Sequence, residues 1–296
     1  MKYERLGTWL ILKFDGEDSV KRVVGEHFLK KITYKHLRNR QEINEDLIIK
    51  NDELWFDIFH DEEIDFVPED DYLDVVYEDD FLLVVNKPSG MLVHPDEKTK
   101  TKTLANLVAG YYQQHGIKTT VRPLHRLDVD TSGLIIFSKV SALQGYFDSL
   151  IADKMIVRDY YAFVNGYYAR GQKFVIDAPI GRDRHNAKKY RVSDTGKEAV
   201  TFGRCIISNR RMNISMLSLR LETGRTHQIR VHMAYHRHPI IGDRLYNENK
   251  SDIRLTLMAY HLNIKSLFHP NGLDIEIPLD SELDNYFKEM RIDEKY

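Results

Sequence analysis

The side chains best suited to chemistry lie close together in residues 123–134, which read PLHRLDVDTSGL. This run places an imidazole, a guanidinium and a carboxylate within four residues, from His125 to Asp128. The Thr-Ser-Gly at 131–133 supplies turn chemistry, and the apolar residues 134–137 predict a buried strand. We therefore expect Asp128 on a loop held by a rigid strand, where catalytic groups are common. Taken alone, the run also fits an Asp or Ser that caps a turn.

Two other arrangements of reactive side chains lack a required member. His125, Asp128 and Ser132 are the residue types of a hydrolytic triad, but they are crowded in sequence and the chain has no Gly-x-Ser-x-Gly elbow. His232 and His236 lie four residues apart on one predicted helical face, yet no Glu follows His232 as the zincin pattern demands. We therefore expect no metal site.

Composition predicts a globular protein with a sizeable core. Hydrophobic residues make up 42% of the 296 positions, enough for one large domain and a small appendage. A single cysteine, Cys205, excludes an intrachain disulfide and a thiolate metal site. The apolar stretch 7–14 is too short to span a membrane and has no small-residue cleavage site after it. We expect a cytoplasmic protein with no membrane partner.

Charge is distributed unevenly along the chain, although the net charge is only −2. Residues 1–80 carry 11 Lys and Arg against 22 Asp and Glu, whereas residues 118–245 carry 22 against 11. The basic surplus therefore falls in the segment that contains the reactive run. A face that binds a polyanion requires this distribution.

The reactive run and the blocks around it resemble the RluA-like family of RNA pseudouridine synthases. The family signature is His-Arg-Leu-Asp followed by Thr-Ser-Gly, and Tyr160 aligns with the family's active-site tyrosine. Arg158 departs from the pattern, because lysine is commoner there; the charge is kept but the donor geometry changes. The resemblance covers about residues 72–265, and its other blocks follow in the expected order at 76–95, 158–166, 178–182, 195–199 and 223–243.

The resemblance implies isomerisation of uridine to pseudouridine without a cofactor. The bond from ribose C1′ to uracil N1 breaks, the base turns, and C1′ joins C5, so no atom is gained or lost. A carboxylate suits the electron-poor anomeric carbon, and Asp128 is the candidate. A guanidinium favours the ionised carboxylate, and we expect Arg225 to be this partner. Attack on C1′, attack on the uracil ring and elimination through a glycal all stay open.

Other residues of these blocks are expected to bind the RNA. Tyr160 offers a ring that can stack on uracil and a hydroxyl that can move a proton, although it also fits an ordinary strand tyrosine. The target uridine must leave its stack, and Arg126 is placed to fill the gap while His125 supports the loop. Ile229 would press on the base, or else belong to a helix core. A basic stretch predicts an RNA-gripping hairpin, with a solvated loop as the alternative, and its candidates are Arg182, Arg184, Lys188 and Lys189.

Periodicity predicts an α+β fold in which strands dominate from residue 73 onward. The apolar run 81–86 and the leucines at 217, 219 and 221 indicate strands, and alternation over 157–164 puts Tyr160 on one face with residues 158, 162 and 164. Helical spacing predicts helices over 141–154 and 226–235, the second capped by Thr226. We expect a largely antiparallel mixed sheet with flanking helices, and the resemblance implies the pseudouridine synthase fold.

Residues 1–66 are expected to form a small α/β unit, separate from a catalytic domain over 72–296. Helical spacing covers 19–31, a second short helix is expected over 32–38, and 43–45 and 54–59 read as strands. This order is similar to the αL RNA-binding module that often precedes the catalytic domain. That module is normally basic and this stretch is acidic, so a packing or interaction appendage is the alternative. The acidic stretch 61–71 reads as a linker.

Three classes of function are consistent with these features. The leading hypothesis is a metal-free and cofactor-free enzyme that acts as a monomer on structured RNA, with ribosomal RNA preferred over transfer RNA. The second is an RNA-binding ribosome-assembly factor that has lost catalysis, but Asp128, Tyr160 and Arg225 together argue against it. The third is a glycosidase or nucleotide hydrolase, which is weaker because no second carboxylate is evidently paired with Asp128.

Overall fold

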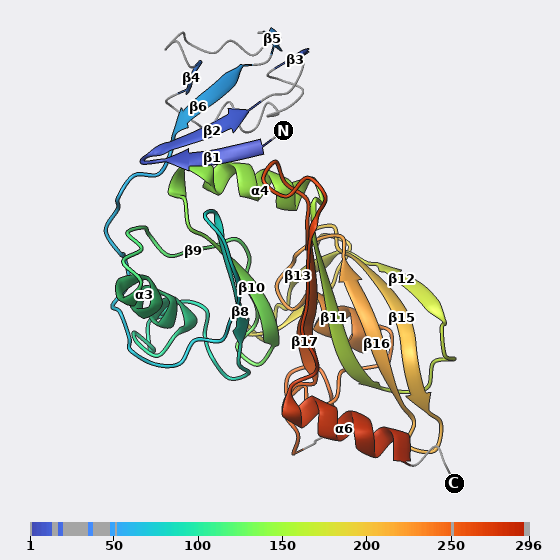
Figure 1. The fold of residues 1–296 in the computed structure, drawn as a ribbon. Helices are drawn as coiled ribbons and strands as arrows, with labels where there is room; N and C mark the ends of the chain where they lie inside the picture. Colours follow the sequence, from blue (N-terminus) through green and yellow to red (C-terminus); the bar gives the residue numbers. More distant parts are fainter. Residues whose placement is uncertain are drawn as a thin grey trace.

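A ten-stranded mixed sheet forms the body of the molecule (Figure 1). The computed structural model describes residues 2–13, 17–19, 35–37, 48–50, 52–249 and 252–292. The strands of this sheet are β7 (Val75–Glu78), β8 (Leu82–Lys87), β9 (Arg122–Pro123), β10 (Ser132–Ser138), β11 (Ile156–Asn165), β12 (Lys173–Asp177), β15 (Val200–Asn209), β16 (Ile214–Leu221), β17 (Leu257–Ile264) and β18 (Leu273–Glu276).

The strand order is β12-β15-β16-β11-β17-β10-β8-β7, with β18 beside β17 and β9 beside β10. Among the described strands of this sheet, only β10 and β17 pair in parallel. The predicted α+β class with a largely antiparallel sheet is confirmed. The strand expected over 157–164 is β11, and Tyr160, Ala162 and Val164 do share one buried cluster.

The parallel pairing joins the two halves of the sheet at Gly133, near the end of the reactive run. Gly133 pairs with Ala259 of β17 and has a φ of +112°, a backbone conformation that favours glycine. A Cβ at this position would lie 2.1 Å from the carbonyl oxygen of Ala259. Glycine is therefore required for β10, and with it the loop of Asp128, to approach β17.

Helices cover parts of the sheet. They are α3 (Leu104–Gln114), a 3-10 turn η1 (Ser141–Leu143) that continues into α4 (Gln144–Ala152), α5 (Gln228–Tyr235) and α6 (Ser281–Ile292). The helix expected over 141–154 is thus confirmed as η1 and α4. The expected cap of the helix at 226–235 is wrong: α5 begins at Gln228, and the residue before it, His227, is the N-cap in a left-handed conformation with φ +57°. None of the described helices is long and apolar enough to cross a membrane.

The N-terminal residues form a smaller sheet that lies above α4 in Figure 1. The predicted strand at 54–59 is β6, but the helix expected over 32–38 is wrong at 35–37, which form β4. The helix expected over 19–31, apart from Ser19, and the strand at 43–45 lie outside the described residues. The strand order is β1-β2-β6-β4 beside a β3-β5 pair, with β1 (Lys2–Leu6), β2 (Trp9–Lys13), β3 (Glu17–Ser19), β4 (Lys35–Leu37), β5 (Ile48–Lys50) and β6 (Glu53–Asp57).

The N-terminal sheet packs on the body through aromatic contacts. Tyr3 of β1 meets Phe81 and Phe268 edge-on, with 5.0 and 6.1 Å between the ring centroids. Residues 58–74 contain no helix or strand, as expected for a linker. The division into a unit over 1–66 and a domain over 72–296 stays a prediction.

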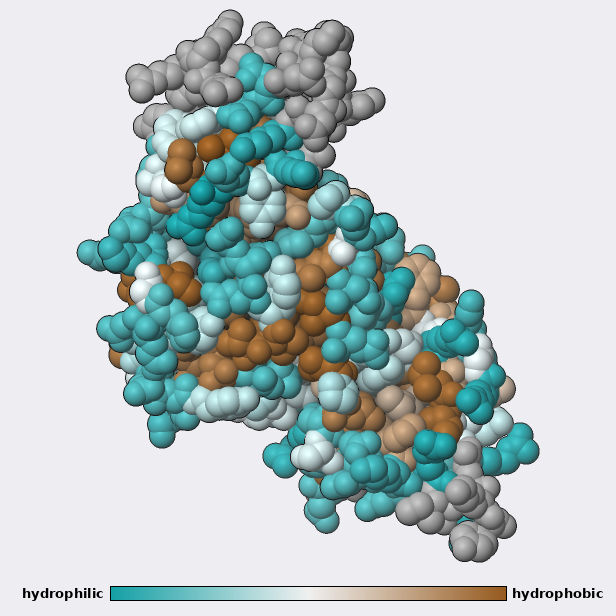
Figure 2. All heavy atoms as spheres, viewed as in Figure 1, coloured by the Kyte–Doolittle hydropathy of each residue, from teal (hydrophilic) through white to brown (hydrophobic). Residues whose placement is uncertain are grey.

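One face of the main sheet is open at β12 and β15. Val175 and Phe202 are partners in the register of these strands and are 54% and 39% exposed. Figure 2 shows apolar surface over this part of the sheet. Tyr160 belongs to the buried cluster under α5, so the candidate site lies on the covered side.

Candidate active site

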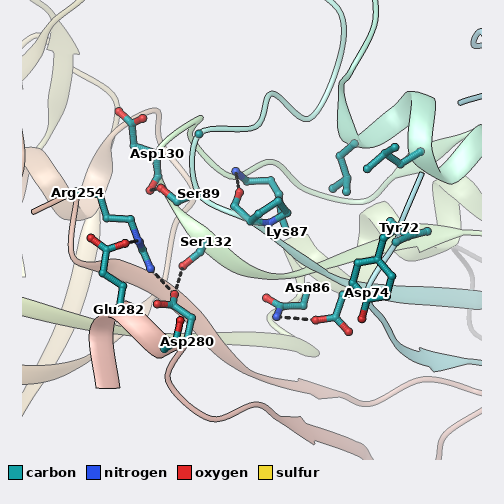
Figure 3. Close-up of a pocket in the computed structure, with 16 residues that line it drawn as sticks. Tyr72, Asp74, Asn86, Lys87, Ser89, Asp130, Ser132, Arg254, Asp280 and Glu282 are labelled. Carbon is teal, nitrogen blue, oxygen red and sulfur yellow. Dashed lines mark hydrogen bonds and ion pairs between the residues drawn. The ribbon is translucent and has the colours of Figure 1, made fainter. Parts of the chain in front are cut away.

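Asp128 lies in the loop between β9 and β10. Lys87 and Ser89, at and just after the end of β8, hold the part of this loop that follows Asp128, and Figure 3 shows both beside Asp130. The fully buried Lys87 donates from Nζ to three backbone carbonyl oxygens at 2.8–2.9 Å, one of them that of Val129. Ser89 Oγ donates to the carbonyl oxygen of Asp130 at 2.7 Å. Strand β8 therefore fixes the turn that follows Asp128.

The ammonium group of Lys87 is strongly desolvated in this position. Burial lowers the pKa of Lys87 to about 8, against the raising effect of Asp130 and Asp128. A cavity of about 630 Å³ lies beside this clamp, with Arg254 and Asp280 in its wall, but Asp128 does not line it. The cavity in Figure 3 is therefore lined by residues that hold the loop, such as Lys87 and Ser89, and not by Asp128 itself.

Asp128 is held by Arg230, a residue of α5. Arg230 Nη1 donates to Asp128 Oδ2 at 3.1 Å, and its Nε and Nη2 donate to the two carboxylate oxygens of Asp243 at 2.8 and 2.9 Å. The side chains of Arg230 and Asp243 are 5% and 0% exposed, whereas that of Asp128 is 24% exposed. Burial lowers the pKa of Arg230, but the carboxylates of Asp243 and Asp128 raise it more, so the guanidinium stays charged. The buried Arg230 thus orients the carboxylate of Asp128, which is partly exposed to solvent.

Arg225, the expected partner of Asp128, makes a different contact. Its Nε donates to the backbone carbonyl oxygen of Glu198 at 2.8 Å. Its backbone N–H donates to Oε1 of Gln228 at 3.0 Å, which fixes the loop ahead of α5. The predicted Arg225–Asp128 pair is therefore wrong. Arg225 still lines the same cavity as Asp128.

A small cavity of about 60 Å³ brings together Asp128, Tyr160, Ile229 and Arg230. Tyr160 comes from β11 and Ile229 from the first turn of α5, and both are 4% exposed. Burial raises the pKa of Tyr160, with Asp128 adding to the effect and Arg158 opposing it. The phenol is therefore neutral at physiological pH and can donate a hydrogen bond. The predicted placement of Tyr160 and Ile229 beside Asp128 matches the structure.

A second cavity of about 440 Å³ also contains Asp128. Arg126, which is exposed, lines both cavities, and His94 and Leu245 form other parts of the wider wall. Burial lowers the pKa of His94, and the charge of Arg126 lowers it further. Asp128 thus stands where a narrow cavity meets a wider one, and Arg126 stands at the junction.

His125 lies under the loop and away from solvent. Burial, with the charge of Arg158, lowers its pKa to about 3, so the ring is neutral. Neither ring nitrogen has a hydrogen-bond partner in the part of the chain that the structure describes. This position is consistent with the expected support of the loop.

The basic stretch forms the expected hairpin, from β13 (Ile180–Arg182) to β14 (Tyr190–Val192). Arg182, Arg184 and Lys188 are exposed and Lys189 is half-buried, and these four residues do not line the cavities around Asp128. Tyr190 and Val192 pack against Val231 of α5. The hairpin therefore stands beside the site and rests on the same helix that carries Arg230.

Sequence reasoning missed Arg230, Asp243 and His227 as parts of the site, although Arg230 and His227 line both cavities of Asp128. Arg230 and His227 lie in the block 223–243, but the sequence alone does not show which guanidinium of that block turns inward. A charged residue on a buried helix face is a usable signal, because such a residue needs a partner. His232, considered as a metal ligand, has both ring nitrogens engaged, by Thr201 Oγ1 and the carbonyl oxygen of Ala178, each at 2.9 Å.

Comparisons with known proteins agree with this geometry. Residues 81–235 match the RNA pseudouridylate synthase family. YhcT of Bacillus subtilis (strain 168), an uncharacterized RNA pseudouridine synthase, is 39% identical over 246 residues, which cover 82% of this chain and 80% of that protein. Ribosomal large subunit pseudouridine synthase D of Escherichia coli (strain K12) is 34% identical over 79% of this chain and 75% of its own length.

The fold agrees with solved structures as well. Human RNA pseudouridylate synthase domain containing 1 superposes with a TM-score of 0.60 at 22% identity, over 76% of this chain and 97% of that one. The expected pseudouridine synthase fold is therefore confirmed. The chain belongs to the RluA-like family of RNA pseudouridine synthases and is an isomerase that acts on uridine in RNA.

Proposed function

We propose that this enzyme modifies specific uridines of ribosomal RNA and that Asp128 is its catalytic carboxylate. The observation that supports this assignment is the convergence of Asp128, Tyr160 and Ile229 on one cavity, with the carboxylate held by Arg230. A carboxylate, an aromatic ring and an apolar wall match the needs of a reaction that frees and turns a flat base beside an anomeric carbon.

In this proposal the narrow cavity receives the uracil. Tyr160 stacks on the base and Ile229 faces it from α5. Asp128 stabilises the anomeric carbon while the bond from C1′ to N1 breaks and the bond from C1′ to C5 forms. The hydrogen on C5 is lost and N1 gains one, so the overall composition of the nucleotide is unchanged. Tyr160, whose raised pKa keeps the phenol protonated, is placed to take part in this proton exchange.

The surrounding residues bind the RNA around the flipped nucleotide. Arg126 stands at the junction of the two cavities and fills the position that the uridine leaves. Arg225 lines the narrow cavity and contacts the substrate there. The exposed cations of the β13–β14 hairpin hold backbone phosphates beside the site, and these cations are Arg182, Arg184, Lys188 and Lys189.

Ribosomal RNA is proposed because several relatives bear the name ribosomal large subunit pseudouridine synthase D. The test uses purified protein and transcripts of large-subunit ribosomal RNA and of transfer RNA, each labelled with tritium at uridine C5. Release of tritium from ribosomal RNA alone supports the proposal. Release from transfer RNA alone contradicts the substrate, and release from neither points to the RNA-binding assembly factor.

A further inference from the structure

Tyr246 touches both the RNA-binding hairpin and the catalytic site. Its Oη accepts a hydrogen bond from the backbone N–H of Tyr190 at 2.8 Å and lies 2.9 Å from Nδ1 of His227. The guanidinium carbon of Arg230 lies 5.3 Å from its ring centroid. Oδ1 of Asp243 accepts the backbone N–H of Tyr246 at 3.1 Å. The same aspartate that anchors Arg230 therefore also positions Tyr246.

The hydroxyl of Tyr246 is placed to set the tautomer of His227, because it lies within hydrogen-bond distance of Nδ1. Burial raises the pKa of Tyr246 to about 12, so the hydroxyl keeps its single proton. One lone pair accepts from Tyr190, and within the described part of the chain the other hydrogen-bond partner of Oη is Nδ1 of His227. The phenol therefore donates to Nδ1. A neutral imidazole whose Nδ1 accepts carries its proton on Nε2.

The protonated nitrogen of His227 faces the catalytic carboxylate. Burial lowers the pKa of His227 and outweighs the raising effect of Asp128, so the ring is neutral at physiological pH. Nε2 lies 3.9 Å from Oδ2 of Asp128, the same oxygen that accepts from Arg230. Oδ1 of Asp128 accepts no hydrogen bond from the described residues. Oδ2 therefore faces both Arg230 and the imidazole, which leaves Oδ1 free for the substrate.

The backbone supports a special role for His227. This residue has φ +57°, a conformation that costs a non-glycine residue free energy and that clusters at functional sites. The conformation places the imidazole between Asp128 and the hairpin, where it meets the ring of Tyr190 edge-on with 5.6 Å between centroids.

We infer that Tyr246 and His227 are positioning residues that couple the RNA-bound hairpin to Asp128. RNA phosphates on the hairpin fix Tyr190, and the backbone N–H of Tyr190 fixes the hydroxyl of Tyr246. This hydroxyl holds His227 as the Nε2–H tautomer, whose Nε2 faces Oδ2 of Asp128 at 3.9 Å as a polar contact longer than a hydrogen bond. The substrate class is the RNA of the function proposed above, on which this inference rests. These contacts are already formed in the free protein, so the hairpin and Asp128 are linked before RNA binds.

The tautomer is measured without RNA, by long-range proton–nitrogen NMR of the histidine rings in the full-length protein. We expect Nε2 of His227 to be the protonated nitrogen, and a mixture of tautomers in Tyr246→Phe. Tyr235→Phe is the matched control, because Tyr235 is an exposed tyrosine of α5 at 59% exposure. Finding Nδ1 protonated in the wild type would overturn the inference.

The coupling is measured by single-turnover rates on RNA. Tyr246→Phe is expected to lower the rate about tenfold, the equivalent of one lost hydrogen bond, while RNA affinity changes less than twofold. His227→Gln keeps an N–H near the position of Nε2 and should stay within about threefold of wild type, whereas His227→Leu should lose about 30-fold. Equal rates for these two variants, or an unchanged rate in Tyr246→Phe, would contradict the coupling. A wild type inactive on all RNA would instead contradict the proposed function, and the NMR result would still stand.

Discussion

Replacing Arg230 by lysine separates the charge of this side chain from its geometry. The guanidinium uses Nε and Nη2 for Asp243 and Nη1 for Asp128. A lysine carries one ammonium group, which is a point charge and cannot reach both carboxylates in the same way. Asp243 is the fully buried partner, so the ammonium is expected to stay with it. Asp128, at 24% exposed, then loses its charged donor and takes water instead.

The size of the effect follows from this single contact. A hydrogen bond to a charged group contributes about 1.5–3 kcal/mol. If this contact is needed to orient Asp128 in the transition state, its loss lowers the single-turnover rate roughly 10- to 150-fold. RNA affinity should change little, because Arg230 is buried, at 4% exposed, and its side chain is engaged by Asp243 and Asp128.

The assay is tritium release from C5-labelled RNA under single-turnover conditions, together with thermal unfolding of each variant. Arg220→Lys is the matched control, since Arg220 forms a bidentate ion pair with Asp159, at 2.6 and 2.7 Å. Neither residue of this pair lines the two cavities that contain Asp128. The control variant should stay within about threefold of wild type. A folded Arg230→Lys variant with the wild-type rate would refute the role assigned to Arg230.

Three further predictions concern other parts of the site. Tyr160→Phe keeps the ring but removes the hydroxyl proton, so the single-turnover rate should fall about 10²- to 10⁴-fold while RNA affinity in binding assays stays unchanged. A wild-type rate in this variant would mean that Tyr160 only stacks on the base. His125 has a folded pKa of about 3 against about 6.5 unfolded, so the unfolded chain binds the proton first and stability falls as the pH drops below 6.5. His125→Leu should therefore gain about 2 kcal/mol over wild type between pH 7.5 and 5 in urea unfolding, and parallel pH curves would contradict this. Arg184→Ala with Lys188→Ala should weaken RNA binding and reduce the slope of log K against log salt by about 1.5; an unchanged slope would remove the hairpin from the interface.

Local patterns predicted the elements that carry the site. Alternation over 157–164 placed Tyr160 correctly, because the side-chain period of a strand is two and Tyr160, Ala162 and Val164 pack in one cluster, while Phe163 of the opposite face packs in another. The apolar run after Thr131-Ser132-Gly133 became β10, so the loop position of Asp128 followed from a short-range signal.

The partners of Asp128 could not be predicted in the same way. Arg225 and Arg230 stand five positions apart in one block, and the left-handed conformation of His227 between them sets where α5 begins. That start turns Arg230 inward, toward Asp243, which lies 13 positions later in the chain. The choice between the two arginines is thus made by a backbone conformation and a tertiary contact, which periodicity does not encode.

A pseudouridine map of total cellular RNA shows whether Asp128 performs the isomerisation. The map compares cells that carry the wild type with cells that carry only Asp128→Asn, after immunoblotting shows equal amounts of protein. We predict that pseudouridine disappears from discrete sites of large-subunit ribosomal RNA in the variant. The same pseudouridine at every site in both cells would contradict it.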